Sequence, residues 1–171
     1  FKQARQMRNI INMVLDMRRM EVGYEALHLL PHPLNAWIES VVGDFAEEFR
    51  TKGIMLFFRA DERVDNVSFD KGKCEIVLSN LLMNALKFSQ EGTTVIVSTE
   101  RFTRFYQGEH QMSGSGIGLS YSKTLLELHG GKIGAYNNEG KGATFWFELP
   151  LTERDMDVVC DPGTYLNDIQ Y

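Results

Sequence analysis

The stretch "NLLMNALKF", residues 80–88, places two asparagines and a lysine in a segment that otherwise has the apolar spacing of a core helix. At about 100° per residue, the side chains of Asn80, Asn84 and Lys87 fall within about 60° of one another and form one polar face. Solvated helix faces more often carry Glu, Lys, Arg and Gln, which have better helix propensity than Asn. A carboxamide oxygen can bind a metal ion, and a lysine suits phosphate. The spacing therefore favours a metal and phosphate face, with an ordinary solvated face as the alternative.

A second polar stretch, "SGSGIGLS" at residues 113–120, is rich in glycine. Gly114, Gly116 and Gly118 let the backbone approach a ligand closely and expose its N–H groups. The stretch runs into the start of a predicted helix, and helix N-termini favour anions. It is neither a P-loop, since GxxxxGK[ST] is absent, nor a dinucleotide fingerprint, since the GxGxxG spacing and a leading strand are absent. The pattern indicates phosphate binding, with a simple Gly/Ser linker as the alternative.

Composition limits the classes of protein to which these residues can belong. With 171 residues, 43% of them hydrophobic, the chain can build one domain with its own core. The net charge is −5 and no block of Lys and Arg stands out, so we expect no nucleic-acid partner. Cys74 and Cys160 are too few and too far apart for a zinc site, and they favour a reducing, cytoplasmic location. No apolar run approaches the roughly 20 residues that cross a bilayer, so we expect no membrane contact by this segment.

The elements before the polar helix are predicted from the spacing of apolar residues and from the Gly, Pro and capping residues that end helices and strands. Residues 1–22 have one apolar helical stripe, which needs a partner helix either in the same domain or in a hairpin or dimer. The other predictions are a strand at 24–31 closed by "PHP" at 31–33, a helix from the N-cap Asn35 to Gly53, a strand at 54–60, a turn-rich link at 61–70, and a helix at 71–89 capped by Asp70.

The elements after it complete a mixed fold. A β-branched run at 93–99 predicts a strand, although residues 93–106 could also form one long strand. We further predict a helix from about Gly118 to Gly130 and a hairpin of "KIGAYNN" and "ATFWFEL" around "EGKG". The tail from 150 to 171 lacks periodicity and is predicted to be a linker. This mixture favours an α+β two-layer sandwich.

The two polar motifs, taken together, resemble those of a known family. "NLLMNALKF", followed by "RFYQG" and by "GSGIGLSYSKTLLELHGGKIGAYNNEGKGATFWFELPL", closely resembles the catalytic ATP-binding domain of sensor histidine kinases, within the group that includes gyrase, Hsp90 and MutL-type ATPases. The resemblance covers residues from about 5 to 151. It implies a histidine-kinase-like, Bergerat-type α/β sandwich preceded by one long N-terminal helix. The implied parts are a second dimerisation helix at 1–22, a catalytic domain at 23–151 and a linker or tail at 152–171.

The resemblance also implies a site for ATP and Mg²⁺. Asn84 would help to coordinate Mg²⁺, Asn80 occupies the neighbouring motif position, Lys87 would contact phosphate and Phe88 would line the nucleotide pocket. The implied cofactor-binding residues are Asn80, Asn84, Lys87, Phe88, Gly114, Gly116, Gly118 and Leu119, and the implied lid residues are Phe102, Phe105 and Tyr106.

The implied activity is transfer of the ATP γ-phosphoryl group to a histidine outside this fragment and then to an aspartate of a response regulator or fused receiver domain. The implied full-length protein is a homodimer through its N-terminal helix, and this segment is the cytoplasmic part of a membrane-anchored sensor. His28, His32, His110 and His129 do not match the phospho-acceptor and are predicted to be surface or capping residues, so we expect no catalytic residue in this fragment.

The sequence departs from the family at the adenine end. A DxGxG box, whose Asp recognises adenine, should follow a core strand, but here Glu100 leads directly to Arg101. Loss of a central strand would leave its neighbours without ladder partners and would leave a void, so we favour an incomplete or damaged sequence between Glu100 and Arg101 over a natural, functional deletion. Two alternatives stay open: a degenerate, non-catalytic module, and a hydrolytic ATPase of the Hsp90 or gyrase type. The second is disfavoured because Asn80 stands where those relatives place a general-base Glu, and an amide cannot accept a proton.

Overall fold

The computed structural model describes residues 15, 26–102, 117–139, 141–151, 165–166 and 169–170. Leu15 is helical. The rest of the predicted helix at 1–22 lies outside the described residues, as does the lid and glycine region at 103–116.

A five-stranded sheet has the order β2-β4-β9-β7-β6. Its first pair, β2 and β4, is parallel, and the other neighbours are antiparallel. The strand bounds are β2 Met55–Arg59, β4 Thr94–Ser98, β6 Lys132–Asn137, β7 Ala143–Glu148 and β9 Ile169–Gln170. The hairpin of β6 and β7 confirms the predicted one, and a side chain at Gly134 would collide with the Trp146 ring on the paired strand.

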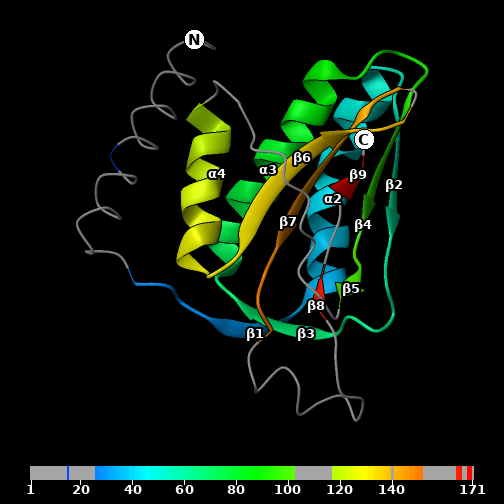
Figure 1. Cartoon of the computed structure of the whole chain (residues 1–171). Coiled ribbons are helices and arrows are strands. Elements are labelled where there is room, and N and C mark those ends of the chain that lie inside the picture. The colour runs from blue at the N-terminus through cyan, green and yellow to red at the C-terminus, as the bar shows by residue number, and fades with distance from the viewer. Residues whose placement is uncertain are drawn as a thin grey trace.

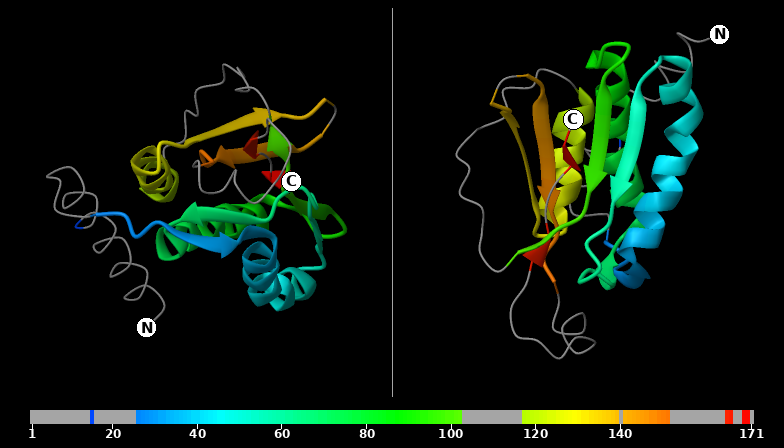
Figure 2. Two further views of the ribbon diagram at one scale, coloured as in Figure 1. Left: turned by 90° about the horizontal axis from the view of Figure 1, so that it is seen from below. Right: turned by 90° about the vertical axis from the view of Figure 1, so that its right-hand side faces the viewer.

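The described helices α2 (Leu34–Thr51), α3 (Lys71–Phe88) and α4 (Ile117–Leu128) lie on one face of this sheet (Figure 1 and Figure 2). The core between the layers joins side chains of all three helices to side chains of the strands. Its fully buried members include Phe69, Val77, Leu78, Leu81, Leu82, Val97, Leu125 and Leu126. Each such leucine contributes roughly 1.5–3 kcal/mol through burial. The predicted α+β two-layer sandwich is therefore confirmed.

A small second sheet corrects two predictions. β1 (Leu30–Pro33) pairs antiparallel with β3 (Asn66–Phe69), with Leu30 opposite Phe69. The strand predicted at 24–31 was therefore placed too early, and the predicted turn-rich link at 61–70 contains a strand. Buried Val67 and Phe69 alternate with half-buried Asn66 and Ser68, which is the period-two pattern of a strand. The prolines of β1 are tolerated because a strand in a two-stranded sheet is an edge, where an N–H can be dispensed with.

The predicted N-cap of α2 is also wrong. Pro33 is the capping residue, and Asn35 lies inside the first turn. The Asn35 amide donates to the carbonyl oxygens of Asp61 (2.9 Å) and Val64 (2.8 Å). Its Oδ1 accepts a hydrogen bond from the Thr99 hydroxyl at 2.7 Å. The side chain thus serves contacts 26 to 64 residues away, which local capping rules cannot anticipate.

The tail contains strands where a linker was predicted. β5 (Arg101–Phe102) pairs antiparallel with β8 (Tyr165–Leu166), and β9 lies between β4 and β7. Residues 99 and 100 belong to neither strand and separate β4 from β5, so residues 93–106 do not form one long strand. Pairing of this kind is set by distant partners, which is why the tail's own sequence carries no periodicity that reveals it.

Candidate functional site

Helix α3 begins as predicted, with the Asp70 carboxylate accepting a hydrogen bond from the Lys73 N–H at 3.1 Å. Its apolar face is buried against the sheet and the other helices, and comprises Cys74, Val77, Leu78, Leu81, Leu82 and Ala85. The polar residues of "NLLMNALKF" are therefore left on the remaining faces, as the helical spacing predicted.

Asn80 connects α3 to the start of α4. Its amide donates to the Gly118 carbonyl at 3.3 Å and to the Ser122 hydroxyl at 3.1 Å. A Cβ built on Gly118 would lie 3.7 Å from the Asn80 side chain, which is ordinary van der Waals contact. The asparagine face and the end of the glycine motif are thus in contact. The first turn of α4, whose N–H groups favour anions, lies beside Asn80.

In the last turn of α3, the polar side chains are half-buried or exposed. Asn84 is half-buried and makes no hydrogen bond to any residue that the structure describes. Lys87 and Phe88 are exposed, Phe88 to 71%, and the Lys87 ammonium lies 5.0 Å from the Phe88 ring centroid. Lys52 donates to the carbonyl oxygens of Leu86 and Lys87, which satisfies the helix end without using the Lys87 ammonium.

The other predicted site residues have different outcomes. Leu119 is half-buried and packs against the core. Phe102 lies in β5, where its backbone pairs with that of Tyr165. Phe105, Tyr106, Gly114 and Gly116 fall outside the described residues, so they stay predictions.

His129, which was predicted to be a surface or capping residue, is buried and lies against the first turn of α3. The Asp70 N–H donates to Nε2 of His129 at 3.1 Å, and Nδ1 of His129 lies 2.7 Å from the Leu125 carbonyl. The ring therefore carries its proton on Nδ1 and is neutral. Cys74 Sγ is 3.7 Å from the same Nε2. Burial, with the Asp70 charge, raises the pKa of the Cys74 thiol to about 12, so the thiol is unreactive.

Asp70 itself stays ionised at that end. Burial acts to raise the pKa of its carboxyl, but the N–H groups of His28 and Lys73 bond the carboxylate and hold the pKa below its ordinary value. This end of the helix is therefore a connected set of satisfied polar groups, distinct from the open end.

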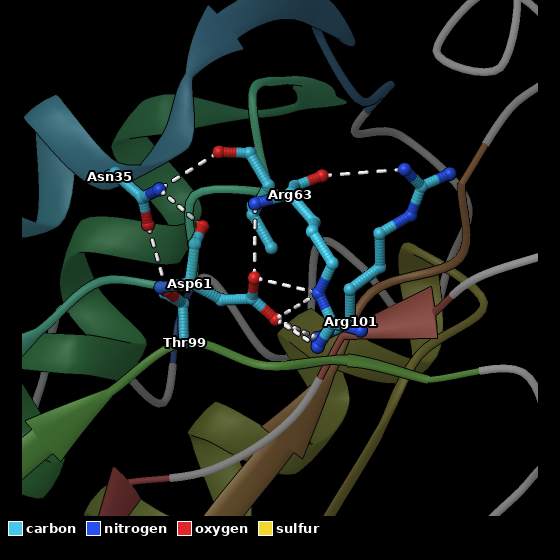
Figure 3. Close-up of polar contacts among 6 residues, drawn as sticks. Asn35, Asp61, Arg63, Thr99 and Arg101 are labelled. Carbon is cyan, nitrogen blue, oxygen red and sulfur yellow. Dashed lines mark hydrogen bonds and ion pairs between the residues drawn. The ribbon is translucent and has the colours of Figure 1, made fainter. Parts of the chain in front are cut away.

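A polar network that sequence reasoning missed surrounds Asp61 (Figure 3). Its carboxylate accepts hydrogen bonds from the Arg63 guanidinium, with an Nη2 to Oδ2 distance of 2.6 Å, and from the Arg101 N–H at 3.1 Å. The Arg63 guanidinium lowers the pKa of Asp61 to about 2, against the opposing effect of burial. The Asp61 N–H donates to the Thr99 hydroxyl at 2.9 Å. The network fixes the end of β4 and the start of β5 against the link between β2 and β3. The sequence feature that could have indicated the network is an Asp directly after a predicted strand.

Metal ligands of the usual protein kind are not gathered anywhere in the described ranges. No three of their His, Cys, Asp and Glu side chains form a group that could hold a metal ion. In the described part of the chain, no helix has the length and apolar character needed to span a membrane.

Known proteins resemble this chain in both sequence and structure. Residues 97–153 match the family model described as histidine kinase-, DNA gyrase B-, and HSP90-like ATPase. The signal transduction histidine-protein kinase BarA of Escherichia coli K12 is 27% identical over 196 residues, which covers 95% of this chain and 21% of BarA.

Among solved structures, the isolated catalytic domain of histidine kinase ThkA has a TM-score of 0.63 at 26% identity and covers 73% of this chain and 98% of its own. The chain is therefore similar to histidine kinase catalytic domains in both sequence and fold. ThkA in complex with the response regulator TrrA has a TM-score of 0.70 at 24% identity, covering 88% of this chain and 49% of that one. ShkA in complex with AMPPNP has a TM-score of 0.72 at 23% identity, covering 88% and 37%. The chain spans about a fifth of the length of the curated relative BarA.

Proposed function

We propose that this domain is the ATP-binding catalytic part of a two-component sensor histidine kinase. It passes the γ-phosphoryl group of ATP to a histidine supplied outside this fragment, from which the group reaches an aspartate of a response regulator. The observation that carries the proposal is the junction of α3 and α4. There Asn80 reaches the Gly118 carbonyl, and one turn further the Asn84 carboxamide has no hydrogen bond to a described residue.

The residues present fit the phosphate and metal end of such a ligand. The Asn84 carboxamide oxygen would be a ligand of Mg²⁺, and the Lys87 ammonium would neutralise phosphate charge. The N–H groups at the start of α4 would receive phosphate oxygens. Bound Mg-ATP supplies the phosphoryl group, and the chain's own task is to hold it and neutralise it.

The adenine end has no counterpart in the described residues. Asp61 and Asp70 are both engaged by backbone N–H groups and, for Asp61, by a guanidinium, so neither is available to bind the base. The alignment with BarA extends over 196 residues, more than the 171 that this chain contains, so BarA has residues with no counterpart here. A degenerate module that no longer binds nucleotide therefore stays the second candidate.

Hydrolysis by this site is disfavoured by the same geometry. Asn80 is committed to Gly118 and Ser122, and a carboxamide cannot take a proton from water. We therefore favour transfer of the phosphoryl group over its release to water.

The partners and location belong to the proposal as well. The response regulator is supported by the likeness to ThkA, whose structure was solved with the regulator TrrA. We further propose that the full-length protein is a homodimer through residues 1–22 and that a receiver domain is an alternative acceptor. The proposed location is the cytoplasm, where ATP is available.

Titration with a fluorescent ATP analogue, with and without Mg²⁺, tests the assignment. We expect saturable binding that strengthens with Mg²⁺, and we expect Asn84→Ala to weaken it about 10- to 100-fold while the thermal midpoint stays unchanged. Glu75→Ala, an exposed position on another face of α3, is the matched control and should bind as the unaltered chain does. Equal binding by Asn84→Ala and the unaltered chain would contradict the placement of the metal, and no binding at all would favour the degenerate module.

A further inference from the structure

The helices α2, α3 and α4 do not all end in the same way. α2 and α4 are each followed by a glycine in the left-handed region, Gly53 at φ +70° and Gly130 at φ +73°. The Gly53 N–H donates to the Arg50 carbonyl at 3.0 Å. The Gly130 N–H donates to the Glu127 carbonyl at 3.0 Å. These two helices therefore satisfy carbonyl groups of their last turn with the chain that follows directly.

α3, which carries the proposed ligand residues, has no glycine cap of this kind. Its C-cap, Ser89, is extended, with φ −72° and ψ 145°, and the Ser89 N–H bonds to the Ala85 carbonyl. An α-helix leaves its last carbonyl groups without a donor from its own ladder. The ammonium of Lys52, the C-cap residue of α2, donates to two of them, the carbonyls of Leu86 and Lys87, the latter at 3.2 Å. A side chain from α2 therefore closes the end of α3.

The backbone around Lys52 is itself fixed. The next residue, Gly53, accepts a hydrogen bond from the Gly92 N–H at 2.8 Å, and β2 begins at Met55. A buried apolar cluster joins the end of α2 to α3 and β4, and its members are Phe49, Ile54, Ala85 and Val95. A cation at the end of α3 is also favoured by the negative end of the helix dipole. Lys52 thus extends from a firmly held backbone to the last turn of α3.

We propose that Lys52 is a positioning residue for the ligand, because it holds the last turn of α3 where the Lys87 ammonium can meet phosphate. This inference rests on the proposed function, since it concerns the same site. The Lys87 carbonyl is bonded to Lys52 while the Lys87 side chain is exposed, so one residue links the cap to the proposed phosphate contact. Without the cap, the last turn frays, and ordering the Lys87 side chain on the ligand then costs more free energy.

Titration of the whole chain with the fluorescent ATP analogue and Mg²⁺ tests this role. We expect Lys52→Met, which removes the ammonium but keeps a long side chain, to weaken binding about 3- to 10-fold. Lys52→Arg keeps donors for both carbonyls and should bind within about twofold of the unaltered chain. Arg50→Met is the matched control, because it removes a positive charge from the same end of α2, where Arg50 bonds to Glu47 of its own helix. It should change affinity by less than about twofold, and every thermal midpoint should stay within about 3 °C.

A double-mutant cycle with Lys87→Ala separates positioning from direct contact. If Lys52 acts through Lys87, Lys52→Met should weaken binding by less than about twofold once residue 87 is alanine. An equal loss in both backgrounds would give Lys52 a phosphate contact of its own and would overturn the positioning role.

Hydrogen exchange without nucleotide keeps this inference distinct from the proposed function. We expect the amides of the last turn of α3, including that of Ser89, to exchange at least about threefold faster in Lys52→Met than in Lys52→Arg. Equal exchange would overturn the inference whether or not the analogue binds. A chain that binds the analogue but loses no affinity in Lys52→Met would overturn the inference alone. A chain that binds no analogue would overturn the proposed function, and the ligand role of Lys52 with it.

Discussion

The two ends of α3 differ in how their polar groups are used. At the first turn, the Asp70 carboxylate, the Asp70 N–H and the His129 ring are all hydrogen-bonded within the protein. At the last turn, Asn84 has no hydrogen bond to a described residue, and the Lys87 ammonium is exposed. Asn80 lies between these ends and fixes α3 against α4.

This difference is what we expect of a helix that packs at one end and, as proposed, binds a ligand at the other. A buried polar group without a partner costs stability, so the closed end must be satisfied internally. A half-exposed amide keeps its hydrogen-bonding capacity for a ligand at little cost in water. Substitutions at the closed end should therefore change stability, substitutions at the open end should change ligand affinity, and Asn80 should change both.

The largest effect is expected at the closed end, for His129→Leu. The Asp70 N–H would lose its buried acceptor, so the free energy of unfolding should fall by about 2–3 kcal/mol. Urea denaturation measures this, and affinity for the ATP analogue under native conditions should stay within about twofold. Lys123→Ala, on the exposed side of the same helix α4, should change stability by less than about 0.5 kcal/mol. A His129→Leu variant as stable as the Lys123→Ala variant would refute the structural role of the ring.

Asn80→Ala should have an intermediate effect that appears in both measurements. Loss of the bonds to Gly118 and Ser122 should cost about 1–2 kcal/mol of stability, because Ser122 is fully buried. The displaced start of α4 should also weaken binding of the analogue about 3- to 10-fold. If only stability changes, Asn80 is a packing residue alone, and the part of α3 that affects ligand binding begins only at Asn84.

Lys87→Ala tests the open end. Removal of an exposed ammonium should leave the unfolding free energy within about 0.5 kcal/mol of its original value. Binding of the analogue should weaken about tenfold at low salt, which corresponds to about 1.4 kcal/mol, and the difference should shrink as salt rises. An effect that does not depend on salt would argue against a charge contact with phosphate.

Asp70→Asn gives the smallest expected effect, and it depends on pH. The folded protein lowers the pKa of Asp70, so the carboxylate stabilises the fold above its ordinary pKa of about 4, and this contribution is lost as the pH falls through the lower, folded pKa. Asn is itself a good N-cap, so the variant should be less stable at pH 7 by only about 0.5–1 kcal/mol. Urea unfolding from pH 7 downward should show the difference closing below about pH 4. A constant difference across that range would show that the charge is not the cause.

Local patterns predicted the parts of the fold that depend on neighbours in sequence. The apolar period of 71–88, the cap at Asp70, the β-branched run of β4 and the β6-β7 hairpin were all confirmed. Each is decided by side chains a few residues apart. The predictions at Asn35, at the second sheet and in the tail were wrong, because those residues bond to partners far away in the chain.

The sequence by itself determined the polar face of α3, since helical spacing and residue type are local properties, and its resemblance to a known motif led to the proposal of a nucleotide site. Only the tertiary structure decided that Asn80 would meet Gly118, that His129 would be buried against the cap of α3, and that residues 169–170 would complete the sheet. Those contacts join segments separated by tens of residues. Their free energy arises from satisfying buried backbone and side-chain groups together, which no short stretch of sequence specifies.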